Sequence, residues 1–159
     1  MRLSSRRTAR RGASTVEAAI VIPIFLLMVL GMIDLSMAVT RYNTLSQAAR
    51  YGARQVAVHG STSVVTGSTD AKWTSAWGTT AIDQQADVTG VNEVDAVRPM
   101  LVVCPLNQTR VKVNWLDNGN AVGDRVRVTV TSSYQPLVTY IFGGTAISLS
   151  ASSTMLISH

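Results

Sequence analysis

Residues 17–39 read EAAIVIPIFLLMVLGMIDLSMAV, an apolar run that begins directly behind a carboxylate. Between residues 18 and 39 only Asp34 and Ser36 are polar. A helix needs about 20 apolar residues to cross the hydrocarbon core of a bilayer. We therefore predict a membrane-spanning helix over residues 18–39, with Asp34 at its outer interface.

Glu17 stands at the inner edge of this apolar run. An ionised carboxylate beside lipid is costly unless it finds a partner, and acids in membrane segments mark functional positions by default. Glu17 is therefore the leading functional candidate in the chain. The alternative interpretation is an interfacial acid that stays solvated at the membrane surface.

An arginine-rich head precedes the run, formed by Arg2, Arg6, Arg7, Arg10 and Arg11. The chain has 14 Lys and Arg against 9 Asp and Glu, so without these five it is formally neutral, with nine of each. Cationic residues beside a first span keep that end in the cytoplasm. We predict a single-pass membrane protein with its N-terminus in the cytoplasm and its C-terminal domain outside, and no binding of nucleic acid.

The helical pattern continues beyond the span. One face of this extension carries Arg50 and Arg54, which lie one turn apart and form either a partner-binding site or a solvated face. The other face is apolar and small, with Tyr42, Leu45, Ala48, Ala49, Gly52, Ala53, Val56 and Ala57 at three- and four-residue steps. We predict one helix over residues 13–59, whose small face packs on the protein's own sheet or on a neighbouring subunit's helix.

Residues 60–159 are predicted to form a small extracytoplasmic α+β domain. Residues 110–115 and 125–130 alternate between apolar and polar side chains, as half-buried strands do. Asp117-Asn118-Gly119-Asn120 lies between them and is typical of a hairpin turn. A last strand is predicted over residues 146–157. The fold class is therefore α+β, with a long N-terminal helix followed by a small antiparallel β-sheet.

The middle of the chain is less regular. Residues 60–80 are rich in Ser, Thr and Gly and carry Trp73 and Trp77, which we expect to dock on the core; the alternative is a pair of exposed contact residues. A short helix is predicted over residues 80–88, and a further strand over residues 100–104.

The sequence offers little for catalysis. His59 and His159 are the only histidines, and neither has a metal-ligand spacing with Cys104 or a carboxylate. We therefore predict a protein that is not an enzyme and uses no cofactor or metal. Cys104 is the single cysteine, which excludes an intramolecular disulfide; we expect a buried inert thiol, with intermolecular pairing as the alternative.

Several stretches resemble one known family. Residues 11–23 (RGASTVEAAIVIP) look like the opening of TadE-like proteins, the pseudopilins of the tight-adherence (Tad/Flp) pilus in the type IV pilus superfamily. Residues 31–34 (GMID) resemble the family's helix exit, and residues 48–54 (AARYGAR) its Ala-Ala-Arg-x-Gly-Ala-Arg stretch. Its closing strands are similar to residues 128–130 (VTV), 134–137 (YQPL) and 147–151 (ISLSA).

This resemblance implies a minor pilin or pseudopilin-like component of a Tad pilus. A prepilin peptidase would cut after Gly12, leaving a leader of residues 1–12 and Ala13 as the new N-terminus. In the superfamily, the carboxylate at the place of Glu17 meets the N-terminal amine of a neighbouring subunit. The implied partners are other pilins, the Tad secretion machinery, the peptidase and the membrane. Ala18 departs from the family, because many relatives carry an aromatic residue there.

A rival interpretation is an export signal that is removed. Residues 4–8 (SSRRT) weakly resemble a twin-arginine signal, and residues 36–38 (SMA) have the small side chains that a signal peptidase needs. Residues 39–159 would then be a secreted binding or adhesion domain. Against this, the apolar run exceeds the roughly 7–15 residues of a signal core, and Glu17 interrupts its approach. A third interpretation is a single-span membrane protein with no pilus role.

Overall fold

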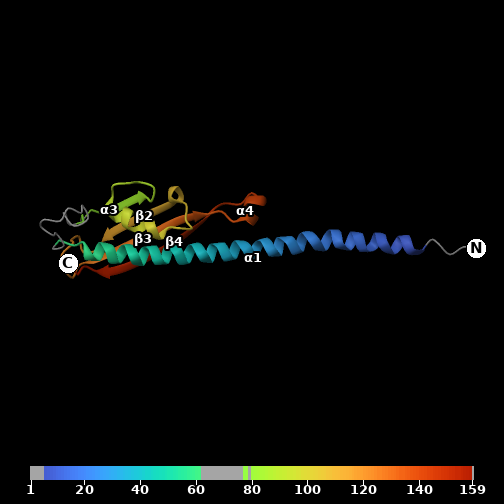
Figure 1. Ribbon diagram of the computed structural model, residues 1–159, viewed down its shortest axis with the longest axis horizontal. Helices are drawn as coiled ribbons and strands as arrows, with labels where there is room; N and C mark the ends of the chain where they lie inside the picture. Colours follow the sequence, from blue (N-terminus) through green and yellow to red (C-terminus); the bar gives the residue numbers. More distant parts are fainter. Residues whose placement is uncertain (1–5, 62–76, 79, 159) are drawn as a thin grey trace, which may run out of the picture.

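The computed structural model describes residues 6–61, 77–78 and 80–158 (Figure 1). One helix, α1 (Arg6–Val58), extends along the molecule, and a sheet lies beside its C-terminal half. At 1.5 Å per residue, the 53 residues of α1 span roughly 80 Å. The predicted α+β fold, a long N-terminal helix followed by an antiparallel sheet, is confirmed.

Four strands form one antiparallel sheet in the order β1-β2-β3-β4. They are β1 (Ile82–Gln85), β2 (Thr109–Trp115), β3 (Arg125–Tyr134) and β4 (Ile147–Leu156). In the central pair, Val111 lies opposite Val130 and Val113 opposite Val128, and all four are fully buried. The predicted alternation is therefore confirmed, and it fixes which face of the sheet packs on α1.

The face of α1 that covers the sheet is built from small residues. Short side chains allow the helix backbone to approach the strands closely, so the two elements share one core. The buried residues of this face are Leu45, Ala48, Ala49, Ala53, Val56 and Ala57. The prediction that this face packs on the protein's own sheet is confirmed for these residues, whereas Tyr42, which was assigned to the same face, is 50% exposed.

The helix predicted over residues 80–88 is wrong, because strand β1 occupies Ile82–Gln85. β1 pairs with β2, with Ile82 opposite Val113, and Arg110 of β2 bonds to Asp83 at 3.0 Å. This long-range pairing overrides the local preference of a segment with little apolar alternation. The helix of this region lies later, at α3 (Asn92–Val97), where Glu93 and Asp95 in the first turn favour a helix start.

The strand predicted over residues 100–104 is also wrong. The chain forms a 3₁₀ turn, η1 (Arg98–Met100), then bends without pairing before a second 3₁₀ turn, η2 (Leu106–Gln108). Pro99 and Pro105 flank this segment, and proline has no N–H to donate to a strand ladder. Cys104 is buried and unpaired, and burial raises the pKa of its thiol, in agreement with the expected inert cysteine.

Trp77 is buried and stacks on His59, with ring centroids 4.2 Å apart and an interplanar angle of 15°. This contact lies just beyond the C-terminal end of α1, so Trp77 docks on the core as expected. Trp73 lies outside the described residues.

The predicted hairpin turn is present between β2 and β3. Asn118 adopts a positive φ of 56°, a conformation that Asn tolerates better than most residues. Asp117 closes the turn by accepting three hydrogen bonds from Arg125: one from the backbone N–H at 2.8 Å and two from the guanidinium at 2.7 and 3.1 Å. These bonds hold the pKa of Asp117 at about 2.

This depressed pKa makes the contribution of the turn to stability dependent on pH. The contribution is complete above the ordinary pKa of Asp, near 3.9, and is lost as the pH falls towards about 2. Asp117→Asn should therefore be less stable than the wild type by a constant difference above about pH 5, and this difference should shrink below pH 4. Urea unfolding of the full chain in detergent micelles from pH 2.5 to 7 measures it; an equal difference at pH 2.5 and 6 would contradict the assignment.

Candidate functional site along the N-terminal helix

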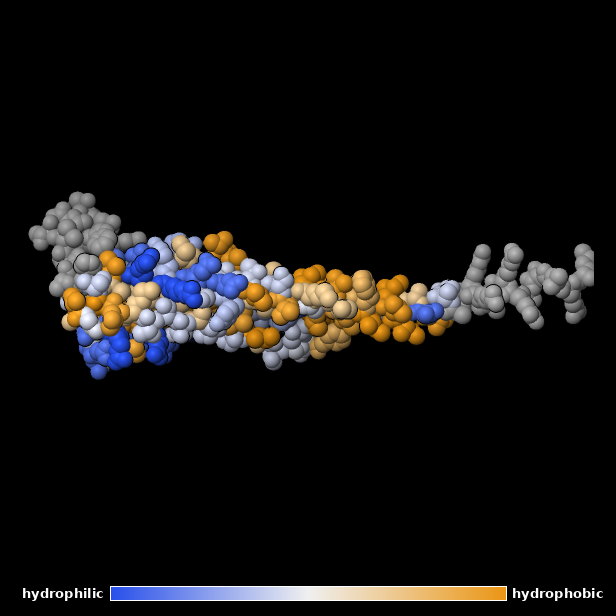
Figure 2. All heavy atoms as spheres, turned by 90° about the horizontal axis from the view of Figure 1, so that it is seen from below, coloured by the Kyte–Doolittle hydropathy of each residue, from blue (hydrophilic) through white to orange (hydrophobic). Residues whose placement is uncertain are grey.

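The apolar segment of α1 projects beyond the sheet domain. Within the described residues, one helix is long and apolar enough to cross a membrane, and none of its most apolar stretch is buried in the molecule. Large apolar side chains such as Ile20 and Phe25 are about 60% exposed, at 61% and 60%. Figure 2 shows this segment as a continuous hydrophobic band between the more polar sheet domain and the N-terminal end. The helix therefore fits a single-pass membrane anchor.

The predicted processing residues lie at the N-terminal end of this band. Gly12, Ala13 and Glu17 all belong to α1, and both Gly12 and Glu17 are exposed. Among the residues that the structure describes, no hydrogen bond or ion pair engages the Glu17 carboxylate. Glu17 is thus presented on an uncovered helix and is accessible to a group from outside the described chain.

Arg50 and Arg54 lie on the side of α1 that faces away from the sheet. Both are exposed, and within the described ranges neither forms an ion pair. The small residues between and around them, Ala49, Gly52 and Ala53, are buried. The AARYGAR stretch therefore has two faces: its small residues hold the sheet, and its arginines remain available to a partner.

The structure keeps Glu17 and the two arginines apart. Thirty-three residues of one uninterrupted helix separate Glu17 from Arg50, which corresponds to roughly 50 Å. These residues therefore form two separate sites within a single molecule. A contact between Glu17 and a cation requires the chain's own N-terminal region or another subunit.

A polar cluster at Asp34 was not predicted from the sequence. Its carboxylate accepts hydrogen bonds from the backbone N–H of Leu137 at 2.9 Å and of Val138 at 2.8 Å, and from the Tyr134 hydroxyl at 3.2 Å. Leu137 and Val138 open the short helix α4 (Leu137–Ile141), which follows Pro136. Asp34 thus satisfies the free N–H groups at the start of α4 from a different element. We call this cluster the Asp34 latch.

The latch also orients the end of β3. Asp34 is only 7% exposed, and the guanidinium of Arg41 lies over the Tyr134 ring, 4.7 Å from its centroid. Arg41 stands two turns after Asp34 on α1, so the helix contacts Tyr134 at both its hydroxyl and its ring. The expectation for Asp34 was an interfacial position alone. Residues 31–34 (GMID) and 134–137 (YQPL), two of the stretches on which the expected family resemblance rests, lie together in the structure.

His59 and Glu93 are two further polar side chains that are buried in the molecule. His59 is buried, and its Nδ1 lies 2.7 Å from the Gln55 carbonyl oxygen. Glu93 is also buried, and desolvation raises the pKa of its carboxyl group. Within the described part of the chain, no group of three or more His, Cys, Asp or Glu residues is placed to hold a metal ion.

One α-helix thus supplies both an uncovered apolar segment and a face that packs on a four-stranded antiparallel sheet. A family model described as TadE-like protein matches residues 12–54. The matched segment begins at Gly12 and includes Glu17, the apolar span, Asp34 and both arginines. The resemblance identified in the sequence is confirmed for this segment. No curated protein and no solved structure matches the chain.

Proposed function

We propose that this chain is a minor pilin or pseudopilin-like subunit that takes part in building a Tad-type pilus. A prepilin peptidase cuts after Gly12, and the mature protein, beginning at Ala13, stays in the inner membrane through α1. Its N-terminus faces the cytoplasm and its sheet domain lies outside. The observation that carries this proposal is Glu17, which has no partner among the residues that the structure describes, at the start of an uncovered apolar helix and inside the segment that matches the TadE-like family.

Glu17 is the residue through which this helix would recognise another subunit. Its carboxylate at the edge of lipid is unfavourable alone, and a cation supplied by a neighbouring pilin offsets much of that cost. Cleavage after Gly12 would place a new amine at Ala13, at the same end of the helix as Glu17. The amine of one mature subunit and the carboxylate of the next are thus complementary, and their pairing favours one helix register.

The main test of processing is the mature N-terminus, measured by mass spectrometry of the protein purified from its native membrane. We expect the wild type to begin at Ala13 and Gly12→Leu to retain Met1, because the added side chain blocks the peptidase. Ala13→Ser, which keeps a small residue on the other side of the cut, is the matched control and should be processed. An intact Met1 in the wild type contradicts processing, and a protein that begins at Val39 supports the secreted alternative.

The secreted alternative conflicts with the Asp34 latch. A cut after Ala38 would remove Asp34 and leave the N–H groups of Leu137 and Val138 without their acceptor. α1 also continues through residues 36–39 without interruption. These observations favour retention of the helix over its removal as an export signal.

Glu17→Ala is expected to be processed and inserted normally but to lose its contacts with other pilins. The measure is crosslinking from a photoreactive residue at position 20 in cells that assemble the pilus. We expect crosslinking to fall at least about tenfold. A tenfold change in a binding equilibrium corresponds to about 1.4 kcal/mol of binding free energy. Glu17→Asp retains the charge and serves as the control. Wild-type levels of crosslinking and pilus assembly in Glu17→Ala would remove the basis for this role.

A further inference from the structure

The connection between β3 and β4 ends in an apolar tip that no part of the described molecule covers. The side chains of Leu137, Tyr140, Ile141 and Phe142 are 51%, 73%, 57% and 67% exposed. We call these residues, which lie in and just after α4, the α4 tip. Figure 1 shows that α4 projects from the sheet along α1, towards the N-terminal end of the molecule.

The level of the α4 tip along the anchor is fixed by the Asp34 latch. Leu137 and Val138 donate directly to the Asp34 carboxylate, so α4 starts beside that turn of α1. Seventeen residues separate Glu17 from Asp34, a rise of about 25 Å, whereas the hydrocarbon core is about 30 Å thick. With Glu17 at one boundary of the bilayer, Asp34 and α4 therefore lie within about one helical turn of the opposite boundary.

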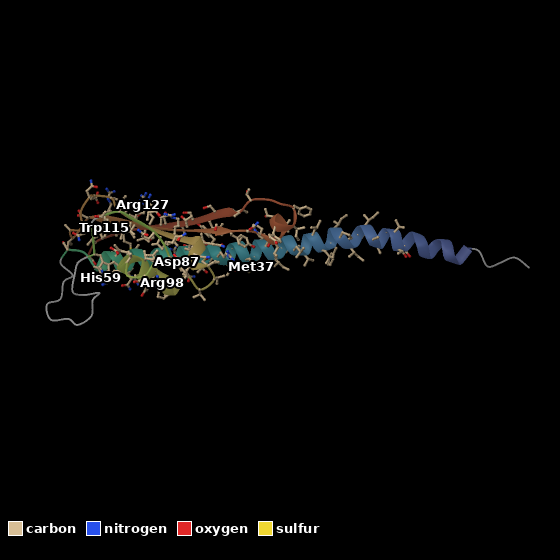
Figure 3. The ribbon with its side chains drawn as sticks, turned by 90° about the horizontal axis from the view of Figure 1, so that it is seen from above. Met37, His59, Asp87, Arg98, Trp115 and Arg127 are labelled. Atoms are coloured by element: carbon tan, nitrogen blue, oxygen red, sulfur yellow. The ribbon has the colours of Figure 1, made fainter. Side chains whose placement is uncertain are left out.

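The distribution of charge along the sheet agrees with this placement. Charged side chains such as Arg125 and Arg127 gather where β3 begins, whereas residues 128–158 contain no Asp, Glu, Lys or Arg. Figure 3 shows Arg127, His59 and Trp115 at the end of the sheet domain away from Met37, and Met37 lies one turn from Asp34 on α1. The α4 connection and the ends of β3 and β4 that adjoin it thus carry no Asp, Glu, Lys or Arg, and this is the part of the sheet domain that meets the anchor at Asp34.

We infer that the α4 tip is a second membrane contact, which inserts between the lipid headgroups and the acyl chains of the outer leaflet beside α1. Apolar and aromatic side chains favour this boundary, where Tyr keeps its hydroxyl in the headgroup layer. The tip also shields Asp34, because an acid at this depth requires hydrogen-bond donors from protein. The inference rests on the proposed membrane insertion of α1, and it is independent of cleavage and of pilus assembly.

The test is depth-dependent quenching of a fluorophore in nanodiscs of phosphatidylethanolamine and phosphatidylglycerol, with one protein per disc. The full chain carries Cys104→Ala and one new cysteine labelled with the environment-sensitive probe NBD. Phe142→Cys reports on the tip and Ile20→Cys on the span. Val122→Cys is the matched control, because Val122 is 60% exposed and follows the hairpin turn at the charged end of the sheet.

We expect lipids with a nitroxide near the headgroup to remove about half or more of the fluorescence at position 142 and little at position 122. The probe at position 20 should be quenched when the nitroxide lies in the acyl chain. Quenching at 20 without quenching at 142 would overturn the inference and leave the anchor intact. A blue-shifted but unquenched probe at 142 would show protein contact instead and also overturn it. No quenching at position 20 would refute the membrane anchor itself, and the tip contact with it.

Discussion

Gly52→Val is expected to weaken the packing of α1 against the sheet severely. A Cβ atom at Gly52 would lie 2.5 Å from Cγ2 of Val97 and 3.3 Å from Cγ1 of Val128. Both valines are fully buried, and their short branched side chains have little freedom to move aside. Overpacking of this kind costs about 1–3 kcal/mol, to which the two further methyl groups of Val add. Urea unfolding of the full chain in micelles should show a lower midpoint with an unchanged m-value.

Gly31→Val provides the matched control within the same helix. A Cβ at Gly31 has nothing within 4 Å, so this substitution adds the same atoms without a collision inside the molecule. We expect its unfolding midpoint to stay close to that of the wild type. Equal midpoints for Gly52→Val and the wild type would show that helix and sheet do not pack at this separation.

Asp34→Ala is expected to release α4 from the anchor while the centre of the sheet stays folded. The substitution removes the acceptor for two backbone N–H groups and for the Tyr134 hydroxyl. Donors left without a partner at a protected site favour local opening. Hydrogen exchange of the amides of residues 137–142 should accelerate by about 10- to 100-fold, while the β2 and β3 amides keep their protection.

Two further variants distinguish the contribution of the Tyr134 hydroxyl from that of the two backbone N–H groups in the Asp34 latch. Tyr134→Phe removes one donor and leaves both backbone bonds to Asp34, so exchange in α4 should change little. Asp34→Asn keeps one oxygen but places an amide donor against a backbone N–H, so its effect should fall between those of Tyr134→Phe and Asp34→Ala. Wild-type exchange of α4 in Asp34→Ala would show that the latch does not hold α4.

The parts of the fold that could be predicted are those with a strong local period. The apolar span, the small face around Ala48 and Ala53 and the alternating valines of β2 and β3 each repeat often enough to define an element. β1 was missed because its four residues depend on pairing with β2, more than twenty residues later in the chain. The strand predicted at residues 100–104 is absent because the flanking prolines have no N–H for strand pairing, although the residues between them are mostly apolar.

The candidate site likewise has residues that could be predicted from the sequence and contacts that could not. Glu17, Arg50 and Arg54 could be proposed because charge stands out on an apolar or small-residue helix. The latch could not, because Asp34 and Leu137 are 103 residues apart and backbone N–H donors leave no trace in a sequence pattern. The family match includes Asp34 but ends at residue 54, so it does not show that Asp34 meets the start of α4.

The sheet domain is fastened to α1 at two levels, at Asp34 near the anchor and at Ala57 near the far end, where the carbonyl oxygen of Ala57 accepts the N–H of Ser158 at 3.0 Å. The same helix forms the anchor and packs on the sheet. A force applied to the outer end of the sheet domain is therefore transmitted to α1 as shear between β4 and the helix. This shear is distributed over the length of α1 from Asp34 to Ala57, which is about 35 Å, and is not concentrated at one hinge. A torque applied to the outer end of the sheet domain likewise rotates the membrane-spanning segment, because the sheet packs on the same helix.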